Sequence, residues 1–399
     1  MAAAPPPSTA STSTNPSSTP STQRTLRIGT RSSALALTQC HLFTTLLTTH
    51  TPSLTTAILP THTSLGDTDK STSLHTLASG GKALWTEDLE AELLNGRVDI
   101  LVHSMKDVPT QIAREFRVAA FGMREEPRDA VVMSVTRSKE GKKMLGELPE
   151  GGVVGTSSVR RAAMIRRKYP HLTIQDVRGN IGTRLNKLDT PSLGFDALVL
   201  AGAGVQRLGM GDRVSSWLGS DEGVLHAVGQ GALGVEWRAG DEWVEGLVGG
   251  CGRGREGRRV RWECVAERGV LRALEGGCSV PVGVECGWED GAAPQSKAGL
   301  ADAGGDGKGD EGFENDDALP APSAFDADVA GGFLTMRAMV VSLDGKECVE
   351  GSQRCYVNSD AEAEECAMKL YKELVEKGAE KILKEITLNR GMIRGQDGA

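Results

Sequence analysis

Short apolar segments rich in Val, Ile and Leu alternate along the chain with longer segments of helical spacing. These apolar segments lie at residues 26–28, 98–102, 153–154, 172–177 and 197–200. Runs of this length, bounded by Gly, Pro and polar residues, are typical of buried strands. Strands that alternate with helices predict an α/β fold built on parallel sheets.

Other segments show helical or extended patterns that can be placed more closely. Residues 86–96 predict a helix with Thr86 as N-cap, Glu87 and Asp88 at its positive start, and Gly96 after its end. Residues 262–274 predict a second helix. Near the end of the chain, 333–341 predict a strand and 361–386 an amphipathic helix. The last two elements indicate a small α+β domain.

Two segments lack the apolar side chains that a core needs. Residues 1–23 consist almost wholly of Ala, Pro, Ser and Thr, and they predict a disordered tail, with a transit peptide as the alternative. Residues 289–330 are rich in Gly, Ala and Asp, with eleven acidic residues against two lysines. We expect the second segment to be a disordered acidic insertion in the α+β domain.

Composition excludes several classes of protein. The net charge of −8 and the aromatic content of 4% argue against a nucleic-acid binder, and no apolar stretch is long enough to span a membrane. The arginine-rich run 253–261 is short, lacks interleaved aromatic residues, and is interpreted as a connector between domains. The eight cysteines are too sparse for a disulfide scaffold and lack zinc-ligand spacing, so we expect reduced thiols and no metal.

Polar motifs follow several predicted strands. GTSSVRR after 153–154 contains Thr156, Ser158, Arg160 and Arg161; RGNIGTR after 172–177 contains Arg178 and Arg184; and Arg207 follows 197–200. Small residues, hydroxyls, helix-start N–H groups and arginine forks together favour a bound polyanion. A single motif of this kind would more often be a solvated helix face, but its repetition at strand ends favours a ligand site.

Two further motifs bring a carboxylate into this set. RIGTRSS carries Arg31 and Ser33, and HSMKD carries Lys106 and Asp107 after the strand 98–102. From spacing alone, Asp107 either neutralises neighbouring cations or stabilises positive charge that develops on a substrate. These alternatives stay open at this point.

One cysteine stands apart from the others. Cys278 follows Gly276 and Gly277 after the helix 262–274, which places it on a loop. It is a candidate attachment point or nucleophile, and a Cys-His hydrolase with His103 or His226 is conceivable, although neither histidine lies in a recognisable motif.

Taken together, nine motifs in order between residues 27 and 283 resemble the porphobilinogen deaminase family, also called hydroxymethylbilane synthase. They are RIGTRSSALAL, GGKALWTEDLE, VDILVHSMKDVPT, REEPRDAVV, GTSSVRRAA, VRGNIGTRLNKL, LAGAGVQRLG, AVGQGALGVE and ERGVLRALEGGCSVPVG.

The resemblance implies three domains. Two lobes resemble periplasmic binding proteins around a cleft, and a small α+β domain carries the cofactor. We expect 24–123 with 224–238 to form the first lobe, 124–223 the second, and 239–399 the third domain with its insertion at 289–330.

The resemblance also implies an activity. A dipyrromethane cofactor is bound by a thioether to Cys278, and four porphobilinogen molecules are added to it head to tail with loss of ammonia. Water then releases hydroxymethylbilane. Each pyrrole carries an acetate and a propionate, so the arginines suit the growing chain.

The site residues are carried over motif by motif. Asp107 is expected to be the catalytic residue, stabilising the cationic azafulvene. The expected cofactor-binding residues are Cys278, Lys106, Asp107, Thr156, Ser158, Arg160, Arg161, Arg184 and Arg207; the expected substrate-binding residues are Arg31, Ser33, Arg178 and Arg184. Many relatives carry a second Lys where this chain has Ala78, four residues before Lys82.

The rival function is a two-lobed protein that binds a carboxylate ligand without chemistry. It would need the arginines but neither Cys278 nor Asp107. We further expect a cytoplasmic monomer that binds no nucleic acid or membrane, with a plastid location if residues 1–23 are a transit peptide.

Overall fold

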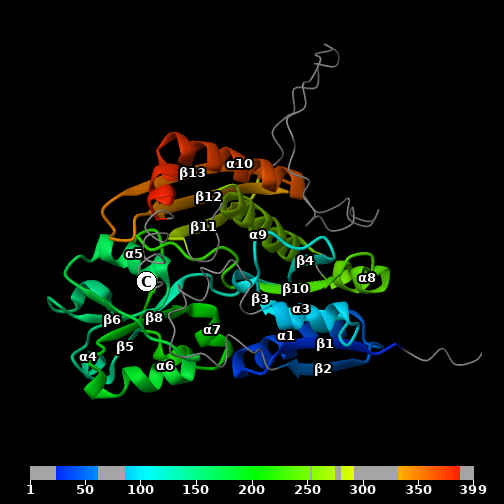
Figure 1. The fold of residues 1–399 in the computed structure, drawn as a ribbon, viewed down its shortest axis with the longest axis horizontal. Helices are drawn as coiled ribbons and strands as arrows, with labels where there is room; N and C mark the ends of the chain where they lie inside the picture. Colours follow the sequence, from blue (N-terminus) through cyan, green and yellow to red (C-terminus); the bar gives the residue numbers. More distant parts are fainter. Residues whose placement is uncertain (1–23, 62–85, 252–253, 275–279, 292–330, 387–399) are drawn as a thin grey trace, which may run out of the picture.

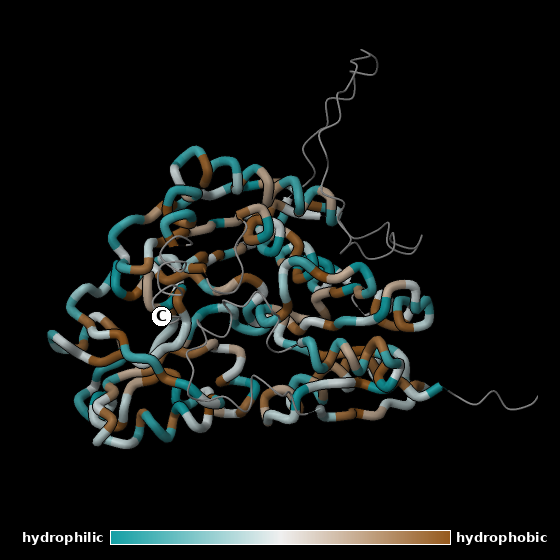
Figure 2. Tube along the Cα trace, in the orientation of Figure 1, coloured by the Kyte–Doolittle hydropathy of each residue, from teal (hydrophilic) through white to brown (hydrophobic). Residues whose placement is uncertain are grey.

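The computed structural model describes residues 24–61, 86–251, 254–274, 280–291 and 331–386. Three sheets organise this part of the chain. In Figure 1 two lobes lie side by side in the lower half, and a third domain covers them from above. Figure 2 shows that apolar residues gather on the strands and on the helix faces turned toward them, so each part has its own core.

The first lobe contains a mixed sheet with the order β2-β1-β3-β10-β4. β1 pairs in parallel with β2 and β3, whereas β10 runs antiparallel to β3 and β4. The helices α1 and α3 pack on it, and Phe43, Phe121 and Trp237 are among its fully buried side chains. The elements are β1 Leu26–Arg31, α1 Ala34–His50, β2 Thr56–Thr61, α3 Glu87–Leu94, β3 Ile100–Ser104, the 3-10 turn η1 Met105–Asp107, β4 Phe116–Phe121 and β10 Leu233–Arg238.

The second lobe repeats this arrangement with the order β7-β6-β8-β5-β9. β6 pairs in parallel with β7 and β8, and β5 runs antiparallel to β8. The elements are β5 Asp129–Met133, α4 Val135–Lys139, η2 Leu145–Glu147, β6 Val153–Gly155, α5 Val159–Lys168, β7 Thr173–Gln175, α6 Ile181–Leu188, η3 Pro191–Leu193, β8 Ala197–Ala201, α7 Gly202–Arg207, η4 Gly211–Arg213 and β9 Ser216–Leu218.

The third domain is an antiparallel sheet, β11-β12-β13, covered by helices. α9 packs against both α10 and β4 of the first lobe, and Met339 and Val341 of β12 join the core of the second lobe. This domain therefore contacts both lobes. Its elements are α9 Arg255–Ala273, β11 Val282–Glu289, β12 Gly332–Val341, β13 Cys348–Val357 and α10 Asp360–Glu376, followed by a short helix at 379–386.

The predicted α/β class is confirmed, but the sheets are mixed rather than parallel. β10 lies in the first lobe after the chain has passed through the second, and it enters the sheet in the opposite direction. Sequence periodicity cannot report strand direction, because the alternation of side chains is the same in both cases.

Several predicted boundaries differ from the observed ones. The strand expected at 98–102 lies at Ile100–Ser104, and the helix expected at 361–386 is interrupted at Gly378, whose φ is 97°. Thr86 does precede α3, but its side chain makes no capping hydrogen bond.

The interpretation of residues 253–261 as a connector was wrong. α9 begins at Arg255, and Arg259 stacks on Trp288 with its guanidinium carbon 4.9 Å from the ring centroid. Residues 239–251 also differ from the expected division. Helix α8, Glu242–Cys251, packs in the core of the first lobe through Val244 and Val248, and not in the third domain.

Candidate active site

Two predicted site residues act first as helix caps. The hydroxyl of Ser33 accepts a hydrogen bond from the N–H of Ala36 at 3.3 Å, and that of Ser158 accepts one from the N–H of Arg161 at 3.4 Å. Each serine stands between a strand and a helix that begins beside the site, because a serine in extended conformation satisfies the free N–H groups of the first turn. The caps hold the starts of α1 and α5 at the carboxyl ends of β1 and β6.

A cavity of about 60 Å³ lies where β1 and β3 end. Arg31, Ser33, Ser104 and Asp107 line it, and the amide nitrogen of Gln39 donates to the hydroxyl of Ser104 at 2.8 Å. Asp107 belongs to η1 and is exposed, so its carboxylate is accessible from this cavity. The resulting surface combines one acid, Asp107, with one arginine and several hydroxyl groups.

A second carboxylate, Asp129, organises the arginines of the second lobe. It is fully buried, and its two oxygens accept from Arg160 at 2.8 Å and from Arg161 at 2.7 Å. The amide of Gln230 donates to it at 2.8 Å. Burial alone would raise the pKa of Asp129, but the charges and hydrogen bonds of the two arginines lower it overall, so it stays ionised.

Lys106 connects this group to the first lobe. Its Nζ donates to Oε1 of Gln230 at 3.3 Å, and the same oxygen accepts from Arg161 at 3.4 Å. Burial lowers the pKa of Lys106 to about 8; Arg161 and Arg160 act in the same direction, while Asp107 and Asp129 oppose them. A negative ligand would raise this pKa again, because opposite charge favours the protonated form.

The motif after β7 adds two arginines. Nε of Arg184 donates to the carbonyl of Gly179 at 2.7 Å, and Lys187 donates to the carbonyl of Arg178 at 3.1 Å. Burial lowers the pKa of Arg184 to about 10, and Arg161 and Arg178 act in the same direction while Asp107 opposes them. These charges therefore act on one another across the two lobes.

Arg207 and Arg160 have partners that the sequence did not indicate. Arg207 donates to the carbonyl of Gly231 at 2.7 Å and lies 3.1 Å from the carboxylate of Glu125, at the segments that connect the lobes. Arg160, besides its bond to Asp129, donates to the carbonyl of Leu225. Both side chains are therefore held by the protein itself.

The donor set suits a ligand with several carboxylates. Nε of Arg161 is buried and makes no hydrogen bond among the described residues. Around Asp107 and Asp129 gather more cations than two carboxylates neutralise, which favours negative ligand groups. Within the described ranges, no group of three or more His, Cys, Asp or Glu side chains is arranged to hold a metal ion.

Comparison with protein families decides what this site belongs to. The model described as "Porphobilinogen deaminase, dipyromethane cofactor binding domain" matches residues 26–246, and "Porphobilinogen deaminase, C-terminal domain" matches 262–292. The chain belongs to the porphobilinogen deaminase family. Porphobilinogen deaminase of Neurospora crassa is 40% identical over 372 residues, covering 92% of this chain and 96% of that protein. Porphobilinogen deaminase of Nostoc sp. is 44% identical over 264 residues, covering 66% and 78%.

The family membership confirms three predictions. The chain is a transferase that condenses porphobilinogen into hydroxymethylbilane, and its cofactor is dipyrromethane. Similar solved structures include substrate-binding domain 2 of GlnP from Lactococcus lactis, with a TM-score of 0.39 and 12% identity, covering 62% of this chain and 95% of that one.

Some predicted positions lie outside the described residues, among them Cys278, Ala78 and Lys82. Other participants were missed by sequence reasoning, although Asp129 and Gln230 stand within the motifs REEPRDAVV and AVGQGALGVE. The available signal for Asp129 was its position directly before the apolar run AVV, which predicts a buried strand. An acid at the start of such a strand is itself buried, and a buried acid requires a cation as its partner.

No helix in the described part of the porphobilinogen deaminase chain has the length and apolar character that crossing a membrane requires.

Proposed function

We propose that Asp107 is the catalytic residue of this porphobilinogen deaminase. The observation that carries the proposal is the exposed carboxylate of Asp107 on a cavity that it shares with Arg31 and Ser33. A substrate whose carboxylates bind the arginine brings its aminomethyl pyrrole beside Asp107. The loss of ammonia leaves positive charge on that pyrrole, and a fixed carboxylate stabilises such charge as it develops.

The residues around Asp129 would hold the cofactor and the growing chain. Arg161, Lys106 and Arg184 would supply the positive charges that bind the carboxylates of the ligand. Thr156 and Ser158 would add hydroxyl groups. Each charge-assisted hydrogen bond to a carboxylate contributes about 1.5 to 3 kcal/mol. Arg160 and Arg207 would complete the set; their guanidinium groups, like that of Arg161, also bond to the protein.

Cys278 would carry the cofactor through its thioether. The helix α9 ends at Ala273, a few residues before it. When bound, dipyrromethane supplies the pyrrole end to which substrate units are added. Intact-mass spectrometry of the purified protein tests this assignment: we expect the mass of one dipyrromethane on the wild type and none on Cys278→Ser. An unmodified wild-type chain with full activity would reject the attachment.

The role of Asp107 is tested by Asp107→Asn, which keeps the size of the side chain, removes its charge and replaces one acceptor oxygen by a donor NH2 group. We expect cofactor loading and melting temperature close to the wild type, with a loss of kcat of two or more orders of magnitude, the scale of a lost electrostatic contact. Asp212→Asn, on the turn η4 of the second lobe, is the matched control. A near-normal kcat for Asp107→Asn would remove Asp107 from the chemistry.

We also propose that the enzyme acts as a cytoplasmic monomer. Residues 1–23 contain no Arg, which is untypical of a transit peptide. Gel filtration tests whether the enzyme is a monomer, and a dimer would overturn that part of the proposal. N-terminal sequencing of the native protein tests the location, and removal of residues 1–23 would overturn the cytoplasmic assignment.

A further inference from the structure

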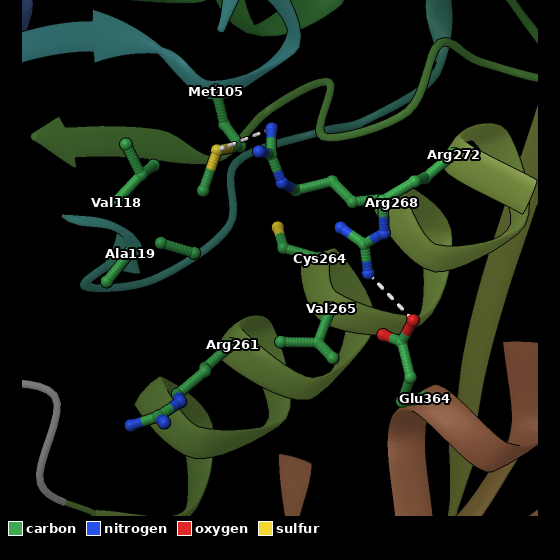
Figure 3. A pocket seen from close by; sticks show the side chains of 10 residues that line it. Met105, Val118, Ala119, Arg261, Cys264, Val265, Arg268, Arg272 and Glu364 are labelled. Atoms are coloured by element: carbon green, nitrogen blue, oxygen red, sulfur yellow. Dashed lines mark hydrogen bonds and ion pairs between the residues drawn. The ribbon is translucent and has the colours of Figure 1, made fainter. Parts of the chain in front are cut away.

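The helix α9 contacts the turn that carries Asp107. Figure 3 shows Arg268 reaching from α9 toward Met105, the first residue of η1, across a cavity between α9 and β4. Its guanidinium donates to the carbonyl of Pro109 at 2.8 Å and to that of Val108 at 3.3 Å. The sulfur of Met105 lies 4.0 Å from the same group. One buried arginine therefore contacts both ends of the turn.

The neighbouring residue on α9 holds the opposite side of the turn. Glu267 accepts a hydrogen bond from the N–H of Gly229 at 2.7 Å. Gly229 has a φ of 69°, and a Cβ at this position would lie 2.8 Å from Cγ of Met105. The N–H of Met105 in turn donates to the carbonyl of Ala232 at 3.1 Å. The turn is thus enclosed between α9 and the segment 229–232.

The turn has little internal structure to fix its position. It is a single 3-10 turn, closed by the hydrogen bond from the N–H of Val108 to the carbonyl of Met105 at 3.1 Å. Pro109 has no N–H and cannot extend it. Short 3-10 turns have weaker hydrogen-bond geometry than α-helices, so external contacts decide where Asp107 lies.

We propose that Arg268 is a positioning residue for Asp107. It holds the carbonyls that follow the turn and thereby sets the position of the carboxylate relative to the cavity. α9 ends at Ala273, five residues before Cys278 in the sequence. This inference rests on the proposed role of Asp107.

The first experiment compares Arg268→Met with Arg268→Lys and Arg261→Met in the complete, cofactor-loaded enzyme. Arg261 is the matched control because it lies on the same helix but pairs with Asp360 inside the third domain. We expect Arg268→Met to lower kcat about 10- to 100-fold with little change in KM, since a displacement near 1 Å costs that much. Arg268→Lys keeps the positive charge but lacks the forked guanidinium group, so its kcat should lie between those of the wild type and Arg268→Met. Arg261→Met should resemble the wild type.

Cofactor loading and melting temperature are measured for each variant. If Arg268→Met fails to fold, Arg268→Lys takes its place in every comparison. The inference is overturned if the kcat of the Arg268 variants matches that of Arg261→Met at a temperature well below melting.

A double-mutant cycle with Asp107→Asn separates positioning from general damage. The rate at which single pyrrole units are added to the loaded enzyme is followed by intact mass. In a protein that already carries Asp107→Asn, we expect Arg268→Met to lower this rate little further, because Arg268 acts through the carboxylate of Asp107. If the two losses multiply in full, Arg268 does not act through Asp107 and the inference fails. If Asp107→Asn alone is fully active, the proposed catalytic role of Asp107 fails instead. The rates of the two single variants therefore distinguish failure of the role of Asp107 from failure of the role of Arg268.

Discussion

Replacing Asp129 by Asn should destabilise the second lobe strongly. The carboxylate is fully buried and holds two arginines that are themselves almost fully buried, with exposed fractions of 5% for Arg160 and 6% for Arg161. The variant keeps the shape but leaves two positive charges facing a neutral amide. Breaking a buried ion pair at one partner costs about 3 to 5 kcal/mol.

This free energy corresponds to a large change in melting temperature. For a cooperative unit of 150 to 250 residues, each kcal/mol changes the melting temperature by about 2 to 4 °C, so we expect a decrease of roughly 6 to 20 °C. Scanning calorimetry at neutral pH measures it. The control is Asp189→Asn, which breaks a two-point pair with Arg213 on the surface, where both side chains are 31% exposed. An exposed pair of this kind contributes about 1 kcal/mol or less.

The pH dependence provides a second measurement on the same variant. Because the folded pKa of Asp129 lies below its ordinary value of 3.8, the ionised carboxylate contributes its full stabilisation above that value. The contribution is lost only as the pH falls below 3.8 toward the folded pKa. The difference between wild type and variant should therefore be constant above about pH 5 and shrink in stronger acid. If Asp129→Asn melts within about 2 °C of Asp189→Asn, the carboxylate does not organise the arginines as described.

Three further outcomes are expected. The pKa of about 8 for Lys106 applies to the site without ligand carboxylates, so Lys106 of the unloaded enzyme loses its proton as the pH rises through 8. Cofactor uptake by the unloaded enzyme, followed by intact mass, should therefore slow between about pH 7 and pH 9, and Lys106→Arg should flatten this dependence; a parallel slowing in that variant would contradict the assignment. Arg184→Leu should slow the later additions more than the first, visible by intact mass as accumulation of partly extended enzyme, and an unchanged distribution would remove Arg184 from chain binding. Replacing 292–330 by a short turn should leave kcat and melting temperature nearly unchanged, because Glu289 and Phe333 are paired neighbours on β11 and β12; a loss of folding would show that the segment is structural.

The chemistry of the site could be read from the sequence because it depends on residue types in ordered motifs. The motifs with Asp107, Arg161 and Cys278 already identified the family, and the alternation of apolar segments with helical ones indicated an α/β chain. Such patterns are local: a strand-to-helix turn with a capping serine, as at Ser33 and Ser158, is specified by a few adjacent residues.

The arrangement of the charges was decided only by the tertiary structure. Asp129 and Gln230 are 101 residues apart, and Arg268 lies 159 residues from Pro109, so no local pattern reports that they touch. The direction of β10 and the start of α9 also depended on distant partners, since β10 pairs with β3 and Arg259 of α9 packs on Trp288. The sequence alone therefore determined which groups this enzyme carries. Folding determined which arginines are neutralised by buried carboxylates and which face the ligand, because burial and pairing are properties of contacts between segments that lie far apart in the chain.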